Sequence, residues 1–327
     1  MQVKRGKVTV TEGRTIRRTC RLQVVGTPDL YELLSTDGTV LAIEHGLRFG
    51  NTTELVPVFV GEVIRGGRGF GDSLVEVAGH DFGHWLTEAR FLTPYSPTGS
   101  PTRAAAISGL VTGGKPGTTV HVTTASTGNI TAGLWDRLRV DAIDDIARDG
   151  NLDAFFLPDG SYMVRDSKTI TTLADYTVRG GRGGTLTDGE RVRPLDRRYN
   201  TVVVSPASTG QVWTAQTAQV SDTANPRHPD RIGVRPYFMS LPTVTSAAQA
   251  LDVAQVALDR IVGTSESIAF GAVSNPALDC GDVVRVVIPG LNGEPDEIVQ
   301  HFLTALSLDL ATGSMTADTR AQRVTNV

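Results

Sequence analysis

Residues 275–288 read Asn-Pro-Ala-Leu-Asp-Cys-Gly-Asp-Val-Val-Arg-Val-Val-Ile and carry the pattern that decides the fold. We expect Leu278 to enter a core and the turn around Gly281 to be tight, because glycine tolerates a positive φ. Val283–Ile288 then predicts a buried strand, and the alternating stretch 302–310 predicts a strand with one solvated face. An amphipathic pattern over Thr245–Val262 precedes them, so the last third predicts a helix packed on a small sheet.

The composition predicts a β-rich α+β protein. The 327 residues suggest two or more domains, and the 35 Gly, 16 Pro and abundant Val and Thr favour turns and strands. The net charge is −4, from 31 Lys and Arg against 35 Asp and Glu. This balance argues against a nucleic-acid binder that works by neutralising phosphates. Cys20 and Cys280 lie far apart, so we expect two small core residues and no disulfide framework.

The sequence shows no apolar run long enough for a membrane helix, and its N-terminus has no apolar core of a signal peptide. We therefore expect synthesis in a cytoplasm without general export. The first residues predict a hairpin over 3–25. In its second strand Ile16, Cys20 and Leu22 face the core and Arg17 faces outward, with Arg18 interrupting the alternation.

Residues 94–101 are rich in Pro, Ser, Thr and Gly and form the clearest predicted boundary. The elements expected around it are a helix over Asp81–Phe91 capped by Asp81, a helix over Arg103–Val111 capped by Thr102, a helix over Leu134–Asp149 with Leu134 on its apolar stripe, a hairpin of 152–156 and 161–165 around Asp159-Gly160, and strands at Tyr199–Ser205 and Val212–Val220.

Four phrases occur in a characteristic order. They are residues 14–22 (RTIRRTCRL), 57–64 with 75–81 (PVFVGEVI and VEVAGHD), 143–150 with 155–165 (IDDIARDG and FFLPDGSYMVR), and the phrase at 275–288. In this order the chain resembles the tail hub, or baseplate hub minor tail protein, of siphophage-type bacteriophages that infect high-GC hosts such as actinobacteria. The resemblance covers nearly the whole chain, and its specificity comes from the order of the phrases.

The resemblance implies two small β-barrel-like tube domains with an intervening α/β module. The implied divisions are 1–92, an N-terminal β-barrel-like hub domain; 93–195, an α+β module; 196–243, strands and a linker returning to the hub core; and 244–327, a helix plus a C-terminal β-barrel-like hub domain. It also implies a homotrimer that forms a pseudo-sixfold ring continuing the tail tube, at the tail tip of a virion assembled in the host cytoplasm.

The partners implied by the resemblance are the distal tail protein or tail tube protein above the ring and a central fibre, spike or receptor-binding protein below, with the tape measure protein. DNA would pass the lumen during ejection without specific binding, and no membrane insertion is expected. From the acidic balance we expect a lumen of negative or neutral charge, since carboxylates repel phosphates.

Several stretches contain residue types that occur in chemical sites. His80 and His84 have the i, i+4 spacing of two zinc ligands, but the usual Glu and a third ligand are missing, which favours capping and packing. The glycine-rich stretches 67–71 and 179–184 lack the following helix of a nucleotide fingerprint, which favours loops.

Acidic residues gather at Asp141, Asp144, Asp145 and Asp149 and at Glu294, Asp296 and Glu297. Paired carboxylates can hydrolyse glycosides, but aromatic residues amount to only 6%, which favours solvated faces. Trp85, Trp135 and Trp213 fall at predicted core or helix positions rather than on a sugar-binding platform.

We therefore interpret the chain as a structural protein and not an enzyme, and we assign no catalytic, cofactor-binding or metal-binding residues and no cofactor. The alternatives are the hub of a contractile injection system, a tail-associated cell-wall hydrolase whose activity would reside in residues 93–190, and a glycan-binding receptor-recognition module.

Overall fold

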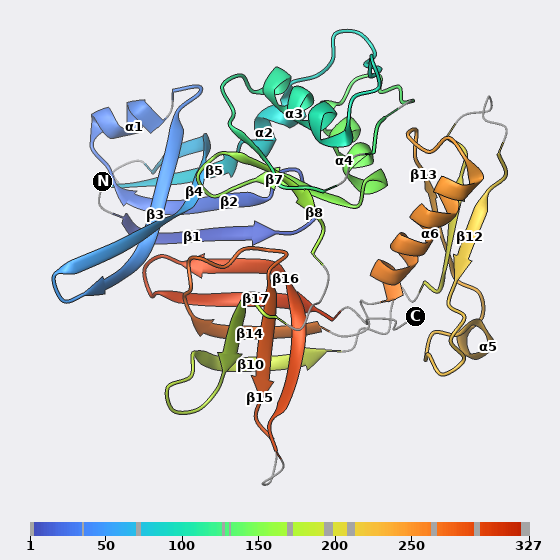
Figure 1. Ribbon diagram of the computed structural model, residues 1–327. Helices are drawn as coiled ribbons and strands as arrows, with labels where there is room; N and C mark the ends of the chain where they lie inside the picture. The colour runs from blue at the N-terminus through green and yellow to red at the C-terminus, as the bar shows by residue number, and fades with distance from the viewer. Residues whose placement is uncertain are drawn as a thin grey trace.

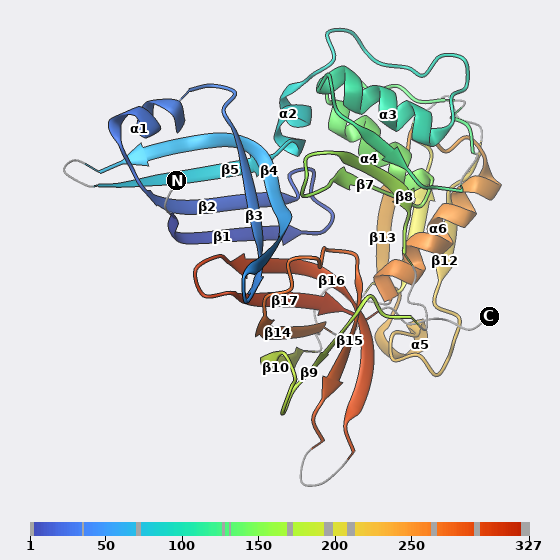
Figure 2. The same cartoon turned by 60° about the vertical axis from the view of Figure 1, so that its left-hand side comes forward.

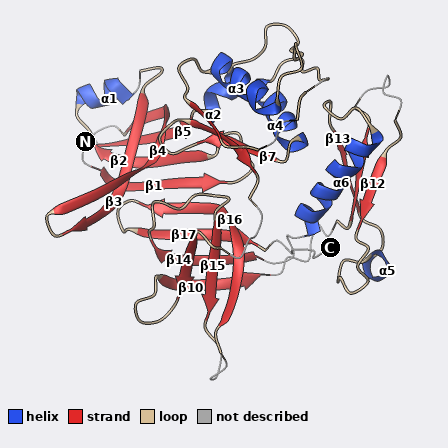
Figure 3. Ribbon diagram, in the orientation of Figure 1, coloured by secondary structure: helices blue, strands red, loops and turns tan. Residues whose placement is uncertain are grey.

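The computed structural model describes residues 3–34, 36–69, 73–125, 128–130, 132–168, 173–192, 199–207, 213–262, 267–290 and 295–321. Within them the chain is β-rich with few helices, which confirms the predicted fold class (Figures 1 and 3). One large sheet of eleven strands occupies one side of the molecule, and two smaller three-stranded sheets with their helices lie beside it. No helix among the described residues is long and apolar enough to span a membrane.

The N-terminal half of the large sheet comes from the first quarter of the chain. Its elements are β1 (Val3–Thr11), β2 (Arg18–Val25), α1 (Pro28–Leu34), β3 (Val40–Phe49), β4 (Thr52–Arg68) and β5 (Leu74–Asp81). The strands pair antiparallel in the order β1-β2-β5-β4-β3. The hairpin predicted over residues 3–25 is therefore present as β1 and β2.

The other half of the sheet comes mostly from the end of the chain. Its strands are β9 (Tyr176–Arg179), β10 (Leu186–Val192), β14 (Ser267–Val273), β15 (Val283–Ile288), β16 (Glu297–Asp309) and β17 (Ser314–Arg320). The first part of β16 pairs with β15, and its last part, Ala305–Asp309, pairs with Lys7–Thr11 of β1. The two ends of the chain are thus joined side by side in one sheet (Figure 2).

The large sheet is open rather than a pair of closed barrels. Its main path runs β10-β14-β17-β16-β1-β2-β5-β4-β3, with β15 and β9 branching from β16. The barrel-like domains expected from the resemblance are therefore two β-rich halves of one open sheet. A shared core of alternating apolar side chains, including Val8, Leu22 and Leu306, runs beneath both halves.

The phrase at 275–288 folds as predicted. Leu278 is buried in the core of the sheet, and Gly281 has φ = 82° in the turn that precedes β15. The buried strand has the predicted bounds, Val283–Ile288. Its partner β16 starts earlier than predicted, because its first residues extend the β15–β16 hairpin away from the rest of the sheet (Figure 1).

An α/β layer covers one end of the N-terminal strands. Its elements are α2 (Gly83–Glu88), α3 (Arg103–Gly114), β6 (Val120–Val122), α4 (Arg139–Asp149), β7 (Leu152–Phe156) and β8 (Tyr162–Asp166). The cap predicted at Thr102 is confirmed, because its Oγ1 accepts the Ala105 N–H at 3.2 Å. The predicted hairpin around Asp159-Gly160 is also confirmed, as β7 and β8 pair antiparallel and Gly160 has φ = 84°.

Two predicted helices are shorter in the structure. The helix predicted over Leu134–Asp149 begins only at Arg139, because Trp135 instead forms a bridge with Tyr95 and Leu134 points to solvent. The helix predicted over Asp81–Phe91 is α2 and ends at Glu88. Asp81 is the last residue of β5, and its carboxylate accepts the N–H of Gly83, the first residue of α2, at 3.0 Å.

The third layer contains β11 (Thr201–Ser205), β12 (Gln216–Gln219), α5 (Pro229–Ile232), β13 (Pro236–Ser240) and α6 (Ala247–Val262). The helix α6 packs on β11 and β12, where Val202, Val204 and Ala218 meet its buried face. The prediction that this helix packs on the strands that follow it was therefore wrong. Its apolar stripe fits the small sheet directly before it in sequence, which leaves the later strands free to join β1.

Candidate functional site: the junction of the layers

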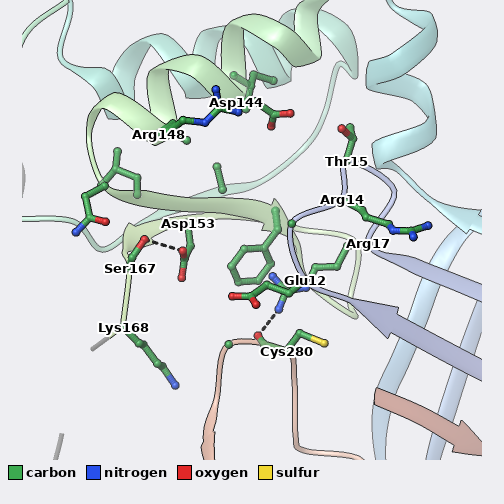
Figure 4. Close-up of a pocket in the computed structure, with 18 of the residues that line it drawn as sticks. Glu12, Arg14, Thr15, Arg17, Asp144, Arg148, Asp153, Ser167, Lys168 and Cys280 are labelled. Carbon is green, nitrogen blue, oxygen red and sulfur yellow. Dashed lines mark hydrogen bonds between the residues drawn. The ribbon is translucent and has the colours of Figure 1, made fainter. Parts of the chain in front are cut away.

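The layers meet around a cavity of about 530 Å³. The turn between β1 and β2, the helix α4, the strand β7, one face of α6 and the turn before β15 all contribute to its lining. Charged side chains from these segments line the cavity, among them Arg14, Asp144, Asp153 and Lys168 (Figure 4). The cavity therefore lies where segments far apart in the sequence converge.

Two consecutive arginines at the start of β2 tie these segments together. Arg17 donates to the carbonyl oxygen of Cys280, lies 3.2 Å from Asp279 Oδ1 and places its guanidinium carbon 3.7 Å from the centre of the Phe155 ring. Arg18 donates to the carbonyl oxygen of Phe156 and forms an ion pair with Asp279 Oδ2. The N-terminal hairpin, β7 and the C-terminal turn are thus connected through two side chains.

Both arginine side chains are withdrawn from water, with exposures of 6% for Arg17 and 2% for Arg18. The prediction that Arg17 faces outward was wrong, because α4, β7 and the turn at 279–281 cover this end of the hairpin. An isolated charge in such a position costs several kcal/mol, so buried charges are retained only when they are paired and hydrogen-bonded. Asp279 supplies that pairing for both arginines.

The carboxylate of Asp279 is held in its charged form. Burial alone would raise its pKa, but the charges of Arg17 and Arg18, with hydrogen bonds from Arg18 and the Cys280 N–H, outweigh it. The pKa of Asp279 therefore lies below its ordinary value. Asp279 is the first of the turn residues recognised in the sequence, yet its ion pairs are with residues about 260 positions away in the chain.

A second buried carboxylate, Asp81, fixes the backbone of the same arginines. Its Oδ2 accepts the Arg18 N–H at 2.6 Å and its Oδ1 accepts the Gly83 N–H at 3.0 Å. Burial raises the pKa of Asp81 to about 6. Gly83 is required here because a Cβ would lie 2.0 Å from the carbonyl oxygen of Thr15. The hairpin and α2 therefore approach each other at backbone contact.

The cavity itself is lined by charges of both signs. Desolvation by the surrounding protein raises the pKa of Asp144 to about 6, although its side chain reaches solvent. Asp153 accepts from the Ser167 hydroxyl at 2.7 Å and lies 3.5 Å from Arg165 Nε (Figure 4). Lys168 pairs with Asp282 at 2.9 Å. Most of these groups are engaged with one another, which suits a joint between layers.

The acidic cluster on α4 is only partly a solvated face. Asp141 is exposed, but the side chain of Asp149 is only 3% exposed. Asp149 accepts from Arg103 at 2.8 and 2.9 Å and from Gln249 of α6 at 2.8 Å. It therefore links α4, α3 and α6. Asp296 and Glu297 are exposed near the β15–β16 turn, and Glu294 lies outside the described residues.

The two histidines with the spacing of zinc ligands lie near each other where β5 meets α2. The rings of His80 and His84 are 5.5 Å apart and roughly perpendicular, and His84 Nε2 lies 3.6 Å from Glu88. No cluster of three or more His, Cys, Asp or Glu side chains suited to a metal ion occurs in the part of the chain that the structure describes. Cys20 and Cys280 are both buried as free thiols.

The glycine-rich stretches lie at turns and strand ends, and the tryptophans lie at packed positions. Arg179 ends β9, and residues 180–184 lie in the turn that leads to β10. Residues 67 and 68 end β4 and residue 69 follows it, with 70 and 71 outside the described residues. Trp135 is buried and donates to Asp145 at 3.0 Å, Trp85 donates to Glu62, and Trp213 packs against the α6 core. The tryptophans are thus distributed among separate cores.

Comparison with known proteins finds similarity to phage tail proteins. A family model described as "Putative phage tail protein" matches residues 140–300. The structure is similar to a tail protein from Neisseria meningitidis MC58, with a TM-score of 0.67, 16% identity and coverage of 99% of this chain and 93% of that one. It is also similar to the tail protein of prophage MuSo2 from Shewanella oneidensis, with a TM-score of 0.60, 13% identity and coverage of 97% and 94%.

A third similar structure comes from an injection system. It is a component of the type VI secretion system of E. coli, described as similar to the T4 bacteriophage tail proteins gp27 and gp5, with a TM-score of 0.54, 8% identity and coverage of 99% and 74%. No curated protein sequence matches. Together, the structural matches show that this chain has the fold of phage tail proteins, and the family model matches about half of its residues.

Proposed function

We propose that this chain is a structural hub protein of a bacteriophage tail tip. Three copies would form a ring that continues the tail tube and connects it to the distal tail protein or tube protein on one side and to a central fibre or spike on the other. DNA would pass through the lumen without specific binding, and the ring would gate that passage. Assembly would take place in the host cytoplasm, with the tape measure protein as a further neighbour.

The observation that carries this proposal is the single open sheet built from both ends of the chain. The pairing of β1 with β16 places two β-rich halves side by side, and β10 and β3 lie at opposite ends of the main path. A ring made from three such chains would contain six β-rich segments around its axis. Exposed edge strands of a sheet are commonly paired with another strand or covered by other segments. A closed ring of subunits can cover such edges, so that none is left to aggregate.

The junction of the layers suits this role. A ring that transmits a signal along the tail needs subunits whose parts hold fixed positions. Here the buried ion pairs of Arg17 and Arg18 with Asp279 hold the two halves of the sheet against β7. We also propose that the chain has no catalytic activity of its own and that residues 93–195 serve as a structural module.

The test is a mass measurement by light scattering on the purified chain, combined with negative-stain images. A three-chain mass with a ring-shaped particle and a central hole supports the proposal. A monomer at every soluble concentration counts against it.

A second candidate is the hub of a contractile injection system. The specific observation that favours it is the similarity in fold to the type VI secretion component, which extends over 99% of this chain. The two readings differ in the particle that contains the protein. Antibody labelling of the protein on DNA-filled virions supports the phage tail, and labelling only on DNA-free contractile particles supports the injection system.

The hydrolase alternative is tested separately at the cavity. Asp144, with its raised pKa, and Asp153 are the carboxylates that line the cavity in the module. Asp153 already pairs with Arg165 and Ser167, so we expect no cleared zone when the pure protein is assayed on host cell walls in a gel. A cleared zone that disappears in Asp144→Asn would establish hydrolysis.

A further inference from the structure

The large sheet presents a solvated face on the side opposite its core. In the middle of this face the side chains are short and polar. The antiparallel register places Thr316 beside Ser307, Ser307 beside Thr9, and Thr9 beside Thr19. The middle of this face therefore carries uncharged side chains, and two groups of charged side chains lie on either side of it.

One end carries a cluster of cations, which we call the basic row: Arg5, Lys7, Arg21 and Arg65. Lys7 lies opposite Arg21, Arg21 opposite Ala78, and Ala78 opposite Arg65, so three of the cations share one line across β1, β2, β5 and β4. All four are exposed and line a shallow groove of about 800 Å³. Among the described residues none of the four forms a salt bridge, although Glu76 and Asp309 lie in the same groove.

The other end carries anions on the same face, which we call the acidic row: Asp188, Glu190 and Asp318. Glu190 on β10 and Asp318 on β17 both lie opposite Ala269 of β14, one from each side, and Asp188 lies two residues before Glu190. The three side chains are exposed, and none of them has an ion-pair partner within the described ranges. β10 is the outermost strand here, paired only with β14 in the described part of the sheet.

Both rows are unfavourable for the isolated chain. Like charges placed opposite each other on neighbouring strands destabilise a sheet, and Lys7 with Arg21 is such a pair. Asp309 lies opposite Lys7 on β16 and relieves part of this repulsion, although it is also held by the N–H groups of Ala311 and Thr312. The remaining charges are of opposite net sign at the two ends of one face, and they are neutralised when one end meets the other.

We propose that the acidic row of one copy docks against the basic row of the next copy around the ring. Figures 1 and 2 show β10 and the β3–β4 pair at opposite ends of the sheet, as a head-to-tail contact requires. A two-fold contact that paired the two rows reciprocally would stop at two chains, whereas a head-to-tail contact closes into a ring. A two-chain mass in the experiment below contradicts the head-to-tail contact. This inference rests on the proposed ring and adds the surfaces that hold it together.

The groove fits a second copy better than nucleic acid. Glu76 and Asp309 interrupt the cations, and a surface that binds DNA through its phosphates needs an unbroken positive patch. The three carboxylates of the acidic row supply a number of charges comparable to the four cations. The occupant and the groove are therefore both encoded in this chain.

The experiment is a charge-swap series in which the mass is measured by sedimentation equilibrium at low salt. One variant reverses the basic row through Lys7→Glu, Arg21→Glu and Arg65→Glu, and another reverses the acidic row through Asp188→Lys, Glu190→Lys and Asp318→Lys. A third carries all six changes. A matched control reverses three exposed arginines elsewhere, Arg90→Glu, Arg182→Glu and Arg231→Glu.

Each single-row variant is expected to weaken association by about 100-fold, because three charge pairs become repulsive. The variant with all six substitutions is expected to regain association to within about tenfold of the wild type, since the charge pairs are restored with exchanged signs. Circular dichroism on every variant verifies that it is folded. Neither loss of folding nor a nonspecific charge effect would restore association in the variant with all six substitutions.

The failures are distinguishable. A wild-type ring that survives both single-row reversals overturns the docking proposal and leaves the ring intact. The docking proposal is also overturned if the control dissociates as readily as the single-row variants, or if the variant with all six substitutions stays dissociated. A wild type that is monomeric at every concentration contradicts the proposed ring itself.

Discussion

The β1–β2 hairpin carries two groups of cations with opposite surroundings. Arg17 and Arg18 are buried and are neutralised by Asp279 from the other end of the chain. Lys7 and Arg21 are exposed on the sheet face and have no ion pair among the described residues. Buried charge on this hairpin therefore joins parts of one subunit, while in the proposed ring its exposed charge joins one subunit to the next.

The largest effect should follow from removing the shared anion of the buried group. We expect Asp279→Ala to lower the free energy of unfolding by about 3–5 kcal/mol, because it leaves two guanidinium groups buried without a counter-charge. Urea denaturation measures the change. Asp252→Asn on the exposed face of α6 is the matched control, expected to shift stability by less than about 0.5 kcal/mol. A loss below about 1 kcal/mol for Asp279→Ala would contradict a stabilising role for the buried ion pairs.

A smaller loss is expected where the hairpin touches α2. Gly83→Ala should cost about 1–3 kcal/mol, because the new Cβ would meet the Thr15 carbonyl oxygen and force the two backbones apart. Gly109→Ala in α3 is the control, since a Cβ there has no neighbour within 4 Å. That control should gain about 0.5–1 kcal/mol from helix propensity and reduced unfolded-state entropy. Equal effects of the two substitutions would show that the close approach of the two backbones at Gly83 does not affect stability.

The buried carboxylate Asp81 predicts a pH dependence. Its pKa is raised from 3.8 to about 6 by burial, so between these values the folded chain holds a proton that the unfolded chain has released. Stability from this group is therefore present below the unfolded pKa and is lost as the pH rises through about 6.

We expect this contribution to amount to roughly 1–3 kcal/mol. Asp81→Asn should remove the decline in unfolding free energy over this pH range, even if its absolute stability is lower. Denaturant titrations at several pH values in both proteins measure the difference in slope. An identical slope in wild type and variant would show that Asp81 titrates normally in the folded protein.

The exposed cations Lys7 and Arg21 predict the smallest change in stability, and removing one of them should stabilise the monomer. Arg21→Thr should raise the stability of the monomer by about 0.2–1 kcal/mol, because it removes the repulsion with Lys7 and places a strand-forming residue on the sheet. Added salt should stabilise the wild type more than the variant, since screening relieves the same repulsion. Thermal unfolding at low and high salt checks this, and destabilisation by Arg21→Thr would mean that the cation already has a partner within its own chain.

Much of the fold could be predicted from local patterns. The strand at Val283–Ile288, the turn at Gly281 and the cap at Thr102 depend on residues close together in sequence, so periodicity and turn chemistry locate them. The end of α4 was predicted correctly, but its start was not, because tertiary pairing of Trp135 with Tyr95 overrides the apolar stripe around Leu134.

The junction could not be predicted in the same way. Burial of Arg17 and Arg18 depends on α4, β7 and the turn at Asp279, which lie far along the chain. The one available signal was that Arg18 interrupts the alternation of the strand at a position that should face the core. A cation at a core position requires a buried anion, and no local pattern says which of the 35 acidic residues supplies it.

The packing partner of α6 was missed for a related reason. Its apolar stripe shows that one face is buried but does not distinguish β11 and β12 before it from β14 and β15 after it. The choice follows from the pairing of β16 with β1, which commits the last strands to the large sheet.

The most direct test of the account is the mass of the wild-type chain by sedimentation equilibrium across a salt series. We predict a three-chain particle at low salt that dissociates into folded monomers as salt screens the exposed rows. The buried ion pairs of Arg17 and Arg18 with Asp279 should keep each monomer folded. A chain that is monomeric at every salt and protein concentration, or a particle whose mass is indifferent to salt, would contradict it.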